Sequence, residues 1–161
     1  MLADDGFSGQ VMIFYNHIVA PQSHQSTNQP ISRATMSPTF TPQLILIAGP
    51  YRSGTGDDPA RMEANVAAME AYALPLFRAG HIPVVGEWLA LPLVRLAGST
   101  QVGDNAFNEI FHPIAERLLE KCDAVLRVGG ASQGADLMVT VARQHGLAVY
   151  FSLDDVPAGA G

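Results

Sequence analysis

The feature that most constrains this fold is a series of four short apolar runs separated by helix-like segments. The first run, residues 43–49, reads QLILIAG, which is typical of a strand buried on both faces of a sheet. Similar runs follow at 81–85, 124–128 and 148–152. Helical patterns lie between them, at 59–80, 106–121 and 135–145. This alternation predicts an α/β domain with a doubly wound parallel sheet.

The segments between the predicted strands contain residues that indicate where helices begin, bend and end. Pro59 suits a first helical turn, Gly80 closes the first helix, and Pro75 is expected to kink its last turns. Residues 86–104 predict a short helix and a loop. Pro113 predicts a bend inside the second long helix.

The amino-terminal part of the chain has a different composition. Residues 21–42 are rich in Ser, Thr, Gln and Pro, with few large apolar side chains to offset the entropy of ordering. We therefore expect a poorly ordered segment over 1–41, a folded domain over 42–155 and a flexible tail over 156–161. Residues 1–35, which precede Met36, are either an upstream extension or supply an edge strand at Val11–Tyr15.

Composition narrows the function. With 161 residues there is room for one ordinary domain, and 15 acidic against 9 basic residues argue against binding a nucleic acid polymer. The single Cys122 cannot form an intramolecular disulfide, which favours the cytoplasm, and no apolar run is long enough to span a membrane. The five histidines are scattered without ligand spacing, so we expect no metal site.

A glycine-rich loop follows the first predicted strand and is the first candidate site. It contains Gly49, Tyr51, Arg52 and Ser53, at the sheet edge where α/β domains bind ligands. Its backbone amides could approach an anion, although it lacks the spacing of a Walker loop or a dinucleotide fingerprint. A plain flexible turn is the alternative.

A second glycine-rich loop follows the third predicted strand. Ser132 could cap the next helix or donate to a phosphate, and Gly134 would keep the backbone approachable. Asp136 in the first helical turn is either a catalytic carboxylate or a charge that favours the helix dipole. After the second strand, Glu87 and Trp88 could place a carboxylate and an aromatic face over the same cleft, or Trp88 could simply cover core.

Three segments, LILIAGPYRSG, RMEANVAAMEAYALPLFRAGHIPVV and ERLLEKCDAVLRVGGASQGADLMVTVARQHGLAVY, occur in order between residues 44 and 151. Together they resemble the nucleoside 2-deoxyribosyltransferase-like superfamily, and in particular its small bacterial branch of unknown function. The resemblance implies a Rossmann-like three-layer sandwich, no cofactor, a nucleoside or nucleotide as ligand, and a homo-oligomer. It also implies cleavage or exchange of an N-glycosidic bond, through a glutamate nucleophile and a supporting aspartate.

The resemblance also implies roles for particular residues of this chain. It places Tyr51 and Arg52 beside the sugar and its 5′ side, and Ser132 with the Gly134 amide at the 5′ group. The family's glutamate falls at Met138 and its supporting aspartate at Ala115, so both expected carboxylates are missing. We take Asp136 and Tyr51 as candidate catalytic residues. The candidate substrate-binding residues are Gly49, Arg52, Ser53, Glu87, Trp88, Ser132 and Gly134.

Three functions remain open at this stage. An enzyme would need Asp136, Glu87 or a carboxylate from a partner subunit to replace the missing pair. A catalytically inactive nucleotide-binding module is favoured by Met138 and Ala115. A structural scaffold would use its glycine loops only as turns.

Overall fold

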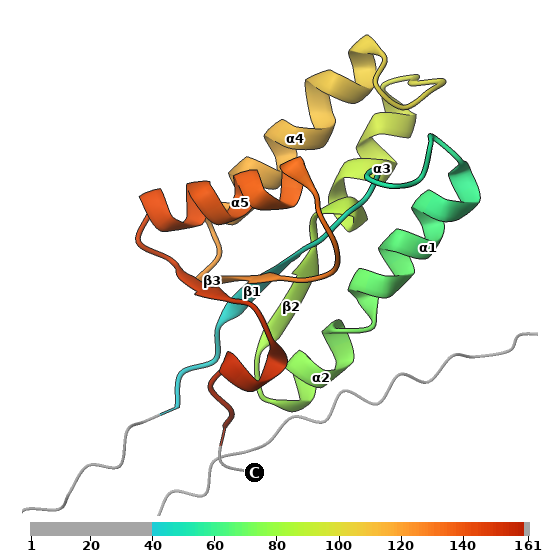
Figure 1. Ribbon diagram of the computed structural model, residues 1–161. Helices are drawn as coiled ribbons and strands as arrows, with labels where there is room; N and C mark the ends of the chain where they lie inside the picture. Colours follow the sequence, from blue (N-terminus) through green and yellow to red (C-terminus); the bar gives the residue numbers. More distant parts are fainter. Residues whose placement is uncertain (1–39, 160–161) are drawn as a thin grey trace, which may run out of the picture. The chain divides into compact units, whose positions relative to one another are not determined.

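The computed structural model describes residues 40–159, and these form an α/β domain around a four-stranded parallel sheet (Figure 1). The strands are β1 (Leu44–Ala48), β2 (Ile82–Val85), β3 (Ala124–Arg127) and β4 (Ala148–Tyr150). Their order is β2-β1-β3-β4, with Ile45 of β1 paired to Pro83 on one side and Ala124 on the other. The Rossmann-like fold expected from the sequence is confirmed.

Side chains of β1 alternate between two cores, as a strand buried on both faces requires. Ile45 and Ile47 pack towards α1 (Pro59–Glu70) and α2 (Ala73–Arg78), which contribute Met69 and Leu76. Leu46 and Ala48 face the opposite layer. That layer contains α4 (Asn105–Leu119) and α5 (Gln133–Gln144), and α3 (Gly86–Leu96) packs against α4.

Two helical segments differ from the sequence prediction. The single helix expected over 59–80 is divided into α1 and α2, and the helix is interrupted at residues 71–72. The reason is that Pro75 has no N–H to donate to the carbonyl of Ala71. Pro75 then falls in the first turn of α2, where its missing N–H costs little. The segment expected to be mixed contains an 11-residue helix, α3, which continues through Pro92. Likewise, α4 continues through Pro113.

The imidazole of His81 joins the two ends of the described domain. His81 is 2% exposed; its Nδ1 accepts a hydrogen bond from the Gln43 backbone N–H at 3.1 Å, and its Nε2 faces the carbonyl oxygen of Pro157. Because Nδ1 is an acceptor, the ring is the tautomer that carries its proton on Nε2 and donates it to Pro157.

The domain extends beyond its expected end at residue 155. After η1 (Leu153–Asp155), Val156 is 8% exposed within the core, and the Gly159 N–H bonds to the carbonyl of Ala79. At the other end, Phe40 packs edge-on against His81, with ring centroids 5.2 Å apart. Residues 1–39, including the alternative edge strand at Val11–Tyr15, lie outside the described residues.

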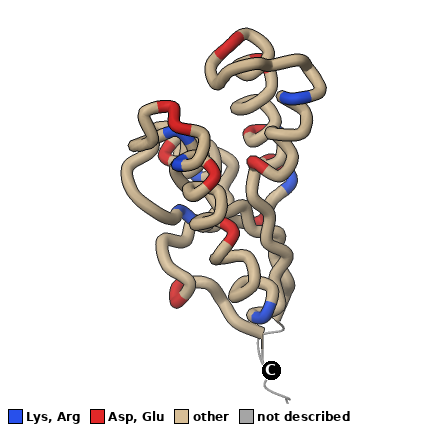
Figure 2. Tube along the Cα trace, turned by 90° about the vertical axis from the view of Figure 1, so that its right-hand side faces the viewer, with Lys and Arg blue, Asp and Glu red and all other residues tan. Residues whose placement is uncertain are grey.

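Charge and hydropathy of the described residues add two observations. Figure 2 shows that Lys and Arg are scattered along the domain rather than gathered on one face. Within residues 40–159, no helix has the length and apolar character needed to cross a membrane.

Candidate functional site

A cavity of about 210 Å³ lies at the carboxyl end of β1. The strand order reverses between β1 and β3, and parallel α/β sheets bind ligands at such a switch point. Four parts of the chain meet there: the loop after β1, the amino-terminal turn of α3, one face of α4 and the amino-terminal turns of α5. Its volume is below the roughly 300–1,000 Å³ of pockets for drug-sized ligands, which favours a small occupant.

The loop after β1 brings Gly49, Tyr51, Arg52 and Ser53 to the cavity. The side chain of Asn65 on α1 anchors this loop by donating to the carbonyl of Tyr51 at 2.8 Å. Thr55, which is 2% exposed, closes the turn because its hydroxyl donates to the carbonyl of Arg52 at 2.7 Å. The loop is therefore held by specific contacts, unlike the plain flexible turn that the sequence left as an alternative.

The guanidinium of Arg52 already has an anionic partner. Its Nε and Nη2 atoms both donate to the carboxylate of Asp57, the second at 2.7 Å. This hydrogen bonding raises the pKa of Arg52 and lowers that of Asp57. A phosphate at this end of the cavity would have to compete with Asp57 for Arg52.

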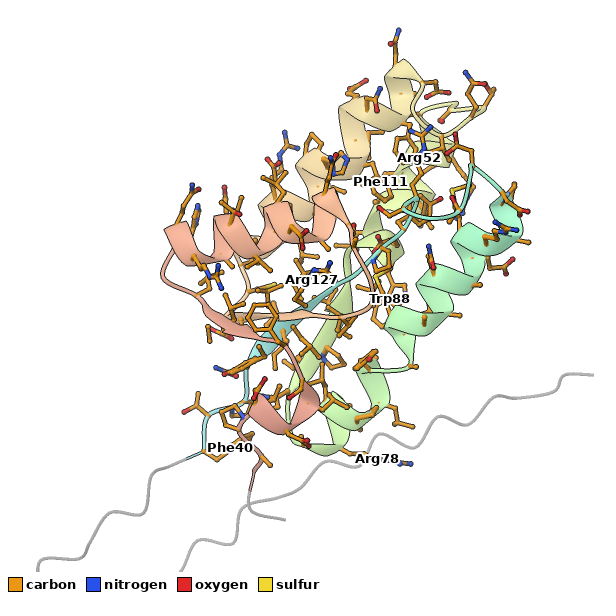
Figure 3. The ribbon with its side chains drawn as sticks, viewed as in Figure 1. Phe40, Arg52, Arg78, Trp88, Phe111 and Arg127 are labelled. Atoms are coloured by element: carbon orange, nitrogen blue, oxygen red, sulfur yellow. The ribbon has the colours of Figure 1, made fainter. Side chains whose placement is uncertain are left out.

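Three aromatic rings form one wall of the cavity. Phe111 lies between Tyr51 and Phe107, with centroid distances of 4.9 and 4.5 Å. Asp104 caps α4 by accepting from the Phe107 N–H at 2.8 Å, and its backbone hydrogen bonds hold its pKa at about 2. Figure 3 shows Phe111 and Arg52 at the same end of the sheet.

Glu87, in the first turn of α3, lines the cavity. Burial raises the pKa of Glu87 to about 7. Burial and the nearby Glu87 charge also raise the pKa of Tyr51, so the carboxyl and the aromatic wall are neighbours. Among the described residues that line the cavity, Glu87 is the one carboxylic acid.

The first turns of α5 complete the site. Ser132 caps the helix, its hydroxyl accepting from the Ala135 N–H at 3.3 Å, and Gln133 and Gly134 follow at the cavity wall. A methyl group added at Gly134 would lie 3.3 Å from His112 Cε1, so glycine permits this close approach. Met138 and Ala115 also line the cavity, so the two positions where the sequence lacks the expected carboxylates lie at this cavity.

Two predicted site residues lie elsewhere. Asp136 accepts a hydrogen bond at 2.9 Å from Nε of Arg127, whose guanidinium also donates to carbonyls of the loop after β3. The Trp88 indole donates to the carboxylate of Glu70 at 2.6 Å, next to α1 (Figure 3). A helix turns about 200° over two residues, which separates Asp136 from Gly134 and Met138.

Sequence reasoning missed four residues of α4 that line the cavity: Phe107, Asn108, Phe111 and His112. They belong to no motif. The available signal was the spacing of Phe107, Phe111 and Ala115, which places all three on one helix face.

The fold and the cavity define a Rossmann-like α/β domain with a small aromatic and acidic pocket at its switch point. Comparisons with protein-family models, curated proteins and solved structures gave no match to this chain. Across residues 40–159, no cluster of three or more His, Cys, Asp or Glu side chains could hold a metal ion. The homo-oligomer implied by the resemblance stays a prediction.

Proposed function

We propose that the cavity binds a nucleoside or nucleoside 5′-monophosphate. The observation that carries this proposal is the combination, in one cavity, of the Tyr51–Phe111–Phe107 wall with the Glu87 carboxyl. Aromatic rings stack well on the flat face of a base, and a few polar groups then fix its orientation. We place the sugar between the two glycine-rich loops, because both loops line the cavity at the sheet edge.

Cleavage of the N-glycosidic bond is the second candidate, and Glu87 is the observation that favours it. A carboxyl with a pKa of about 7 is partly protonated at neutral pH. It could donate its proton to the departing base nitrogen as the bond to the anomeric carbon breaks, while water adds to that carbon. Met138 and Ala115 supply neither a nucleophile nor a charge, so any turnover should depend on Glu87.

Calorimetry and chromatography of the same samples separate binding from cleavage. Nucleosides and their 5′-monophosphates are titrated into the protein, and each mixture is then assayed for free base. Binding without base release supports the binding module, and release that disappears in Glu87→Gln supports the enzyme. Asp136→Asn is the matched control, because that carboxylate pairs with Arg127 outside the cavity. Absence of binding by every ligand would refute the proposal.

A further inference from the structure

The charge environment of Glu87 indicates what its ligand must supply. The ion pairs of the described residues are Arg52–Asp57, Arg61–Asp58 and Arg127–Asp136, so none of them includes Glu87. Among the described residues, the hydrogen bond that acts on the Glu87 carboxyl comes from its own backbone N–H rather than from a side chain. A ligand that brings further N–H groups to this carboxylate would add charge-assisted hydrogen bonds to it.

The aromatic wall fixes the orientation of such a ligand. Phe111 stacks on Phe107 at an interplanar angle of 16° and is tilted by 31° from Tyr51, so the three rings form a compact aromatic stack that lines the cavity together with Glu87. A planar base that continues this stack inside the cavity would present its edge, rather than its face, to the carboxyl. Two N–H donors side by side on that edge would match the two oxygens of a carboxylate.

We propose that the pocket selects a base with two adjacent N–H donors, as on the N1 and exocyclic-amine edge of guanine, and that the Glu87 carboxylate reads this edge. This inference rests on the proposed nucleoside binding and names its ligand class; it replaces the cleavage role of Glu87, because the N1 edge of guanine lies across the purine from the glycosidic nitrogen. The position of Glu87 in the first turn of α3 supports recognition by the ionised form, because the helix dipole favours negative charge there. Guanine is the common base with this edge; adenine offers one donor beside an acceptor.

Inosine provides a matched ligand, because it keeps the N1–H of guanosine and lacks the exocyclic amine. In calorimetric titrations of the full chain at pH 8, we expect guanosine to bind about tenfold more tightly than inosine, since one hydrogen bond to a charged group is lost. Glu87→Gln should remove most of that preference. Asp136→Asn should preserve it, because Asp136 does not line the cavity.

The pH dependence of wild-type binding gives a second measurement that needs no substitution. Glu87 has a pKa of about 7, so the affinity for guanosine should decrease as the pH is lowered below 7. The decrease should approach tenfold for each pH unit. The other titratable groups facing the cavity are Tyr51 and Arg52 on the loop and His112 on α4. A His112→Gln variant should therefore retain the pH response, and Glu87→Gln should lose it.

The outcomes distinguish this inference from the proposed function. Equal affinity for guanosine and inosine, or a preference for adenosine that grows as the pH falls, would overturn the inference and leave nucleoside binding intact. The second result would mean that a protonated Glu87 reads a donor–acceptor edge. Failure of all nucleosides and monophosphates to bind would overturn both proposals.

Discussion

Glu87 is subject to two opposing influences at the scale of a single residue. Its place in the first turn of α3 favours the carboxylate, because the helix dipole attracts negative charge. Its place in the cavity removes water and disfavours the same charge. Burial dominates, since the pKa of Glu87 rises to about 7. The protein therefore holds an acid that changes charge near neutral pH in front of an aromatic wall.

The first prediction follows from that raised pKa. In the unfolded chain the carboxyl ionises at its ordinary value of 4.5, so below that pH both states are protonated and carry no penalty. As the pH rises from about 4.5 to about 7, only the unfolded state gains from ionisation, and the free energy of unfolding falls by up to ~3 kcal/mol. Glu87→Gln should remove this loss.

Urea unfolding of wild type and Glu87→Gln at pH 5, 6, 7 and 8 measures the effect. The advantage of the variant should grow from pH 5 to pH 7 and then level off. Taking the difference between the two proteins cancels the contribution of other titrating groups. A difference that does not change with pH would contradict the assignment of a raised pKa to Glu87.

A second prediction concerns Arg52, whose charge is shared with Asp57. Asp57→Asn should release the guanidinium to meet a 5′-phosphate, so the affinity ratio of monophosphate to nucleoside should rise several-fold. Asparagine suits this position because Asp57 has a φ of 64°, in the left-handed region that asparagine tolerates. Calorimetric titration of both ligands gives the ratio.

Arg52→Ala serves as the control for this substitution. It should lower the ratio to or below its wild-type value, since no cation then remains on the loop after β1 beside the cavity. If Asp57→Asn left the ratio unchanged, the 5′ group would have to lie away from Arg52.

At the scale of elements, the turn from β1 towards α1 depends on close packing at Gly49. A Cβ at this position would lie 2.8 Å from Cγ of Met69, which is 1% exposed, and 3.2 Å from Val128. Gly49→Ala should therefore lower the free energy of unfolding by ~1–3 kcal/mol, as overpacking of a core does. Gly130→Ala is the matched control, because a Cβ there meets nothing within 4 Å.

Chemical denaturation of the two alanine variants tests this packing. If Gly49→Ala and Gly130→Ala proved equally stable, the core of Met69 and Val128 would be looser than these distances indicate. A smaller loss in Gly49→Ala than in the control would have the same meaning.

The strands and the ends of most helices could be predicted because their causes are local. The run 44–48, the cap Ser132 and the stop at Gly146 each depend on residues next to one another in the sequence. The break before α2 and the full length of α3 could not be predicted in this way. Pro92 argues against a helix locally, whereas packing of α3 on α4 stabilises one.

The site shows the same division between local and tertiary causes. The loop after β1 and the Ser132 turn could be predicted, since strand ends carry ligand sites in α/β folds. The aromatic wall could not, because Phe107 and Phe111 reach the cavity only through the packing of α4. Asp136 follows the predicted loop in the sequence, but it lies on a face of α5 away from the cavity. There its carboxylate accepts a hydrogen bond from Arg127.

At the scale of the whole molecule, residues 21–42 carry few large apolar side chains that could join the hydrophobic clusters, which include residues from Leu44 to Val156. We therefore predict that a chain beginning at Met36 keeps the melting temperature of the full chain within a few degrees. This corresponds to a change of less than ~1 kcal/mol in the free energy of unfolding. Differential scanning calorimetry of both chains provides the comparison. A larger drop would indicate that Val11–Tyr15 supplies an edge strand to the sheet.

The hydrogen bonds of His81 bring Gln43 and Pro157, which are far apart in sequence, to opposite nitrogens of one ring. The chain therefore enters and leaves the described domain at neighbouring points. A chain with this layout can be inserted into an exposed loop of another protein, or rejoined through a short peptide and reopened at a new point, without stretching its sheet. The cavity lies at the carboxyl ends of the strands and that junction at their beginnings, so such rearrangements would leave the ligand site intact.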